Sequence, residues 1–73
     1  MQQIKSHPYI DRRTVKAWVT SSGTFIQIVD IRDIYHGFYA VEANICAGGL
    51  SSVFESWSLD KCERWVQENA DNY

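Results

Sequence analysis

Four side chains of this sequence have the chemistry to bind a metal ion or to serve as a nucleophile or base: His7, His36, Cys46 and Cys62. Structural zinc sites draw such residues from close pairs, separated by about two to five residues. No two of the four lie that close in the chain. A catalytic triad needs its three groups in contact, and the spacing of Asp33, His36 and Cys46 does not impose that contact. We therefore predict no metal, no cofactor and no enzymatic activity, with Cys62 pointing inward and Cys46 outward.

The elements that would position these residues begin with strands. A chain of 73 residues makes a single domain, 1–73. Met1–Arg13 shows no periodicity, and we predict an arm that docks through Ile4, Tyr9 or Ile10. Alternating apolar and polar residues then predict an antiparallel meander over residues 14–57. Its strands are Thr14–Ser21, Thr24–Arg32, Phe38–Cys46 and, as a short fourth strand or an extended connector, Leu50–Glu55.

A single amphipathic helix is predicted over residues 58–70. Leu59, Cys62, Val66 and Ala70 recur at helical spacing, and Ser58 is a suitable N-cap because its hydroxyl can accept a hydrogen bond from a free N–H of the first turn. The fold class is therefore α+β, with three or four strands and the helix packed on one face. The predicted core is Ala17, Val19, Ile26, Ile28, Val41, Ala43, Ile45, Leu59, Cys62, Trp65 and Val66.

The first hairpin decides which side chains share a face of the sheet. Ser22-Gly23 fits a two-residue turn, since glycine accepts a positive φ. This turn places Val19 opposite Ile26 and Ala17 opposite Ile28, on the face predicted to meet the helix. The opposite face then carries Lys16, Trp18, Thr20, Phe25, Gln27, Val29 and Ile31, an unusually apolar set for a face in contact with solvent.

An apolar sheet face of this kind is typical of a surface that contacts another protein, and tryptophan and arginine dominate the energetics of such contacts. We therefore hypothesise a non-enzymatic module that docks on a larger protein complex and inhibits or tethers it. A homodimer through the same face is an alternative. The predicted partner-binding residues are Lys16, Trp18, Phe25, Gln27 and Arg32.

A nucleic-acid-binding module is the alternative function. Aromatic side chains can stack on bases and cations can contact phosphates. The net charge of −2 and the pI of about 5.5 oppose this interpretation, because dedicated nucleic-acid-binding domains usually have a pI above about 9. The residues predicted to contact nucleic acid are Arg12, Arg13, Lys16, Trp18 and Arg32.

The order of three strands and a helix that carries Trp65 resembles the small DNA-binding modules of tyrosine-type integrases and of plant ethylene-response factors. The similar segments are Tyr9–Val19, YIDRRTVKAWV, and Phe54–Trp65, FESWSLDKCERW. In those families the sheet enters the major groove, so the resemblance implies that the arginines, lysine and tryptophan named above would lie at the nucleic acid. Asp30, Asp33 and Glu42 stand where such modules are rich in arginine and lysine.

Size and mild acidity also resemble small proteins of phages and mobile elements that inhibit host nucleoprotein complexes, anti-CRISPR proteins among them. That resemblance implies inhibition by binding rather than by catalysis.

The expected compartment is the cytoplasm. No stretch approaches the roughly 18 apolar residues of a membrane span, and no charged end followed by an apolar run indicates a secretion signal. Two cysteines without an export signal suit a reducing compartment. We therefore expect no membrane partner.

Overall fold

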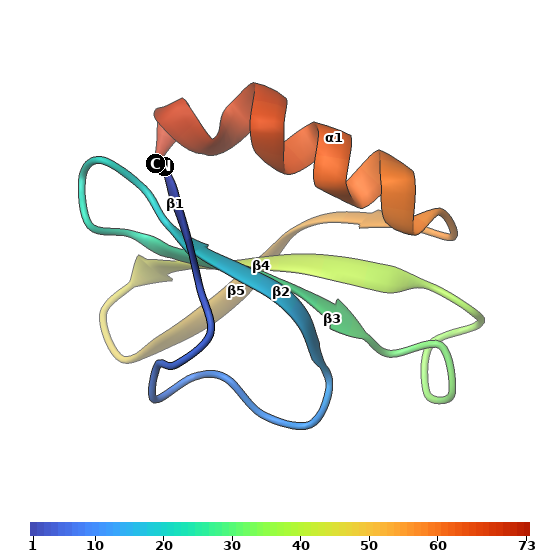
Figure 1. The fold of residues 1–73 in the computed structure, drawn as a ribbon. Helices are drawn as coiled ribbons and strands as arrows, with labels where there is room; N and C mark the ends of the chain where they lie inside the picture. The colour runs from blue at the N-terminus through green and yellow to red at the C-terminus, as the bar shows by residue number, and fades with distance from the viewer.

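The fold is a five-stranded antiparallel sheet with one helix lying across it (Figure 1). The computed structural model describes the backbone of residues 1–73 and every side chain except that of Cys46, so the predicted outward position of Cys46 lies outside the described part. Strands adjacent in the sequence are adjacent in the sheet. The elements are β1 (Gln2–Ile4), β2 (Thr14–Val19), β3 (Phe25–Asp30), β4 (Tyr39–Cys46), β5 (Gly49–Ser56), α1 (Leu59–Asn69) and the short 3-10 helix η1 (Ala70–Asn72).

The α+β class is confirmed, but the sheet has five strands rather than three or four. The segment around Leu50 is a full strand, β5, paired along β4. The additional strand is β1, which lies within the predicted arm and pairs with β2, with Gln2 opposite Val19 and Ile4 opposite Ala17. β1 has no alternating pattern because it is a three-residue edge strand held by backbone pairing, and Ile4 is its one apolar side chain.

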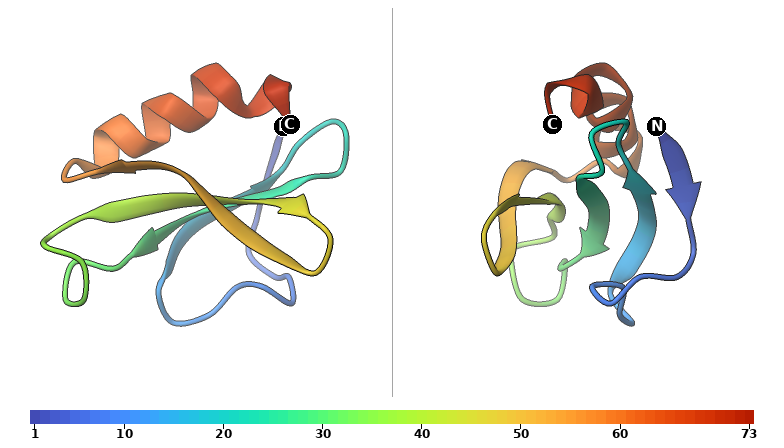
Figure 2. Two further views of the ribbon diagram at one scale, coloured as in Figure 1. Left: turned by 180° about the vertical axis from the view of Figure 1, so that it is seen from behind. Right: turned by 90° about the vertical axis from the view of Figure 1, so that its left-hand side faces the viewer.

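The helix forms where the sequence places it. The Ser58 hydroxyl accepts a hydrogen bond from the Lys61 N–H at 3.2 Å, which satisfies one of the free donors of the first turn. Figure 2 shows that the helix covers one face of the sheet while the loop formed by residues 5–13 lies on the other side. Cys62 and Val66 are fully buried against the sheet, so the apolar side of the helix is the side predicted from its spacing.

The hairpin between β2 and β3 differs from the prediction by one residue. Its loop has three residues, 21–23, because the Thr20 N–H donates to the Thr24 carbonyl and the Gly23 N–H donates to the Thr20 carbonyl, both at 2.9 Å. Gly23 has a φ of +88°, the left-handed residue that a three-residue loop requires. Trp18 therefore lies opposite Ile26.

A one-residue change of register transfers a whole set of side chains to the other face of the sheet. Lys16 and Trp18 share the helix-covered face with Ile26, whereas Phe25 and Gln27 lie on the opposite face. The prediction that Trp18 and Phe25 share one open face is therefore wrong. The side chains that form the main core under the helix are Trp18, Ile26, Ile28, Val41, Ala43, Cys62, Val66 and Ala70, with Leu59 and Trp65 partly buried against them.

Three of the predicted core residues do not belong to the main core under the helix. Ala17 is buried and Val19 is half-buried, but both are on the face away from the helix, as the register requires. Ile45 is 51% exposed. The pairing of β4 with β5 is irregular between Ala43 and Cys46, and such an irregularity interrupts the alternation of side chains at the end of a strand.

The end of the chain holds the tip of the hairpin. The main-chain oxygen of Tyr73 accepts hydrogen bonds from Thr24 Oγ1 at 3.2 Å and from the Ser22 hydroxyl. The hairpin loop is therefore tied to the last turn, η1, at the far end of the helix.

The arm covers the part of the second sheet face around Phe25. The His7 ring stacks on Phe25 with a centroid distance of 4.3 Å, and the Tyr9 ring lies 5.6 Å from the same phenyl ring. Phe25 is consequently only 2% exposed. The expected docking of the arm through Tyr9 is thus observed. Within the described part of the chain, no helix is long and apolar enough to span a membrane.

We expect Val66→Ala to lower the free energy of unfolding by about 2 kcal/mol, because a fully buried side chain is truncated and the space is only partly refilled. Gln67→Ala, at the exposed neighbouring position, should change it by less than about 0.5 kcal/mol. Urea denaturation of both variants measures the difference. Equal effects would contradict the assignment of the buried side of the helix.

Candidate functional site

The predicted partner-binding residues do not form one surface. Trp18, Phe25 and Gln27 are each less than 5% exposed. Lys16 forms an ion pair with Glu63 of the helix, and the Arg32 guanidinium lies over the Tyr39 ring, 4.9 Å from its centroid. The apolar part of the second face, which the alternative of a homodimer would use, is covered by the arm at Phe25.

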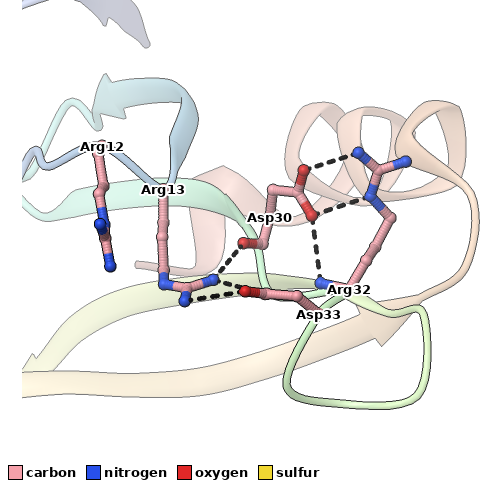
Figure 3. Close-up of a pocket in the computed structure, with 5 residues that line it drawn as sticks. All are labelled: Arg12, Arg13, Asp30, Arg32 and Asp33. Carbon is pink, nitrogen blue, oxygen red and sulfur yellow. Dashed lines mark hydrogen bonds and ion pairs between the residues drawn. The ribbon is translucent and has the colours of Figure 1, made fainter.

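Three of the predicted nucleic-acid contacts are brought together at one end of the sheet (Figure 3). Arg12, Arg13 and Arg32 line an open cleft of about 650 Å³ together with Asp30 and Asp33, and we call it the arginine cleft. Arg12 and Arg13 come from the loop before β2, and the other three residues come from the end of β3 and the loop after it. Lys16 and Trp18 do not line this cleft.

Two of the three guanidinium groups are bound by carboxylates. Arg13 donates to both carboxylate oxygens of Asp33 at 2.7 and 3.2 Å and to the Asp30 carbonyl at 3.2 Å. Arg32 donates to both carboxylate oxygens of Asp30 at 2.9 and 2.8 Å. The hydrogen bonds from Arg13 lower the pKa of Asp33, and those from Arg32 lower the pKa of Asp30. Among the described side chains of the cleft, Arg12 alone has no such partner.

Exposed aromatic and aliphatic side chains lie near the same end of the molecule, on residues that were not among the predicted contacts. Tyr35 is 49% exposed, Ile34 66% and Trp57 72%. Trp57 stacks on Phe38 with a centroid distance of 4.9 Å and an interplanar angle of 19°, and Tyr35 lies 6.0 Å from Phe38. Figure 1 shows the β3–β4 loop and the β5–α1 turn at one end of the sheet. We call Ile34, Tyr35, Phe38 and Trp57 the aromatic surface.

The β3–β4 loop that carries this surface is held by its own backbone. The Tyr35 N–H donates to the Ile31 carbonyl at 2.9 Å, the Gly37 N–H to the Arg32 carbonyl at 3.1 Å, and the Phe38 N–H to the Tyr35 carbonyl at 3.0 Å. Gly37 has a φ of +83°, which a glycine adopts without steric cost. The exposed side chains are therefore presented by a structured loop.

The sequence contains a signal for this surface, but the signal does not follow the periodicity of a helix or of a strand. Ile34, Tyr35 and Phe38 are concentrated in a loop where polar residues prevail in most proteins, and Trp57 stands just before a helix cap. The contact between Phe38 and Trp57 joins separate segments of the chain, and spacing alone does not predict it.

The uncovered part of the second sheet face forms a groove of about 380 Å³ between the arm and β4–β5, which we call the polar-floored groove. Gln27 is 2% exposed and lies in its floor. The Gln27 side-chain oxygen accepts from the Thr14 hydroxyl at 2.7 Å, and its nitrogen donates to the Glu42 carboxylate at 3.0 Å. The predicted contact residue Gln27 is therefore a nearly buried residue in the lining of this groove.

The contribution of the Asp33–Arg13 ion pair to the stability of the fold should depend on pH in the acidic range. The pKa of Asp33 is lowered from 3.8 in the folded state, so the contribution is present above about pH 4 and is lost as the pH falls through the lowered pKa. NMR titration of the Asp33 carboxyl carbon should give a midpoint below 3.8. Arg13→Ala should raise that midpoint and Arg12→Ala should not. An unchanged midpoint in Arg13→Ala would contradict the assigned cause.

Among the described side chains, no group of three or more His, Cys, Asp or Glu residues is placed to hold a metal ion. No family model, curated protein or solved structure matches this chain. The function is therefore inferred from the surfaces described above.

Proposed function

We propose that this protein is a non-enzymatic protein-binding module and that the aromatic surface is its contact site. The observation that carries the proposal is Trp57, which is 72% exposed while its ring stacks on Phe38. A large exposed side chain costs little when it stands alone, but contiguous exposed apolar surface usually marks a contact with another molecule. Tyr35 extends the patch through its contact with Phe38, and Ile34 is the exposed residue next to Tyr35 in the chain.

The type and rigidity of these side chains support the proposal. Tryptophan and tyrosine are the residues most often found to carry the binding energy of protein interfaces. Ordering a flexible loop on binding opposes association. The backbone hydrogen bonds from Tyr35, Gly37 and Phe38 already order the β3–β4 loop in the free protein, so less of this entropy is lost when a partner binds.

Other exposed apolar side chains are distributed over separate parts of the fold. Met1 is at the start of the chain, Val15 is on β2, and Ile45 is at the opposite end of β4 from Tyr39. Isolated residues of this kind are normal on protein surfaces. In the proposed function the module acts by occupying a site on a larger protein complex through one end, and thereby inhibits or tethers that complex.

Nucleic-acid binding is the second candidate, and the arginine cleft is the observation that favours it. A phosphate group could bind Arg12 directly, but it would compete with Asp33 for Arg13 and with Asp30 for Arg32. Three guanidinium groups and two carboxylates leave a net charge of +1 in the cleft. Binding of this kind would weaken steeply as the salt concentration rises, because phosphate contacts release counterions.

The test is affinity capture from a nuclease-treated cell lysate with the immobilised protein, quantified by mass spectrometry. We expect Tyr35→Ala combined with Trp57→Ala to reduce the captured partner at least about tenfold, because the two side chains would supply the central contacts. Val15→Ala combined with Ile45→Ala also removes two exposed apolar side chains and should leave capture unchanged.

Equal capture by both double variants would refute the aromatic surface as the contact site. A protein that is captured from an untreated lysate but not from the nuclease-treated one would favour the nucleic-acid candidate. Thermal unfolding of each variant shows whether a loss of capture reflects a loss of fold.

A further inference from the structure

The polar-floored groove has the size and the lining of a small ligand site. Its volume of about 380 Å³ lies within the range of about 300–1,000 Å³ that is common for such sites. The apolar walls are supplied by Tyr9 of the arm, Val29 of β3, Ile31 just after β3, and Leu50 of β5. These walls come from both sides of the sheet face, so a ligand would lie between the arm and the far strands.

The polar groups at the floor are fixed before any ligand arrives. Gln27 is bound on one side by the Thr14 hydroxyl at 2.7 Å and on the other side by the Glu42 carboxylate at 3.0 Å. Because the Gln27 amide is nearly fully buried, it has little freedom to rotate. Gln27 therefore acts as a positioning residue that holds the half-buried Glu42 carboxylate in the groove.

The charge of the groove is negative. Glu42 and Asp11 line it, and the one cation in the lining, Arg13, is already bound by both carboxylate oxygens of Asp33. The structure gives the Glu42 carboxylate one hydrogen bond, from Gln27. An apolar ligand that displaced water from this carboxylate would leave its negative charge with the hydrogen bond from Gln27 alone, which is unfavourable. A ligand with a positive charge would instead replace the lost water.

We propose that the polar-floored groove binds a small organic cation, an ammonium group on an apolar stem. The ammonium group donates to the Glu42 carboxylate, and the stem packs against Val29, Ile31 and Leu50. This site is separate from the aromatic surface and does not depend on the proposed function. A free amine and the lysine side chain of a polypeptide share this chemistry, and the experiment distinguishes them.

The test is an NMR titration of ¹⁵N-labelled protein with three probes: hexylammonium, hexanol, and Nα-acetyl-lysine methylamide. We expect hexylammonium to shift the backbone amides of Ile31, Glu42 and Leu50 and the side-chain amide of Gln27, with a Kd on the order of 1 mM for a ligand with so few atoms. Hexanol has the same stem without the charge and should bind at least about tenfold more weakly. Equal binding of hexanol, or no shift at these amides with any probe, would overturn the proposal.

Glu42→Gln is the decisive variant because its side-chain oxygen can still accept the hydrogen bond from Gln27 while the charge is removed. It should weaken hexylammonium binding about tenfold. Glu55→Gln removes the same charge from β5 at a residue that does not line the groove, and it should leave the Kd unchanged. Equal affinities of the two variants would overturn the role of Glu42.

The lysine probe identifies the source of the cation. Binding of Nα-acetyl-lysine methylamide that also weakens in Glu42→Gln would support the site and indicate a basic side chain of a polypeptide. Binding of hexylammonium alone would support the site and indicate a free amine. Thermal unfolding of Glu42→Gln and Glu55→Gln confirms that both variants keep the fold.

Discussion

The three-residue loop of the β2–β3 hairpin determines how the rest of the molecule is arranged. It places Trp18 opposite Ile26 on one face of the sheet and leaves Phe25 on the other face. Each face thus carries a large aromatic side chain. Leaving either side chain exposed would lose about 1.5–3 kcal/mol of hydrophobic stabilisation. The helix covers the first face, and the His7 and Tyr9 rings of the arm cover the second. The main-chain oxygen of Tyr73 then holds the hairpin tip against the end of the chain.

Because both faces of the sheet are covered, the surfaces available for binding lie at its end and in the remaining groove. Segments that connect strands and helices commonly carry binding residues on a rigid scaffold. Ser58 has extended backbone angles as the N-cap, with a φ of −103° and a ψ of 121°. Trp57 therefore stands outside the helix, and its ring stacks on Phe38 of the neighbouring loop rather than entering the core. The cap that starts the helix also positions the most exposed aromatic side chain.

Several charged and polar groups in this small domain are paired with one another. Arg13, in the segment before β2, is bound by the Asp33 carboxylate, and Arg32, just after β3, is bound by the Asp30 carboxylate. Inside the fold, the chain of hydrogen bonds from Thr14 through Gln27 to Glu42 satisfies a polar side chain that is almost fully buried. Among the described side chains, no buried nitrogen or oxygen atom lacks a hydrogen-bond partner. An unpaired buried polar group would be costly in a domain of this size, because the stability of such a small domain is marginal.

The sequence by itself determined the elements whose signals are local. The helix, its Ser58 cap and the buried positions of Cys62 and Val66 follow from spacing within one segment, and the alternation of residues predicts β2, β3 and β4. Which face each strand presents was decided only in the tertiary structure, because Ser21-Ser22-Gly23 is compatible with a loop of two or of three residues and glycine supplies the positive φ in both. The tertiary structure also determined the aromatic surface, the arginine cleft and the polar-floored groove. Each joins segments that are distant in the chain, and no local periodicity encodes contacts between such segments.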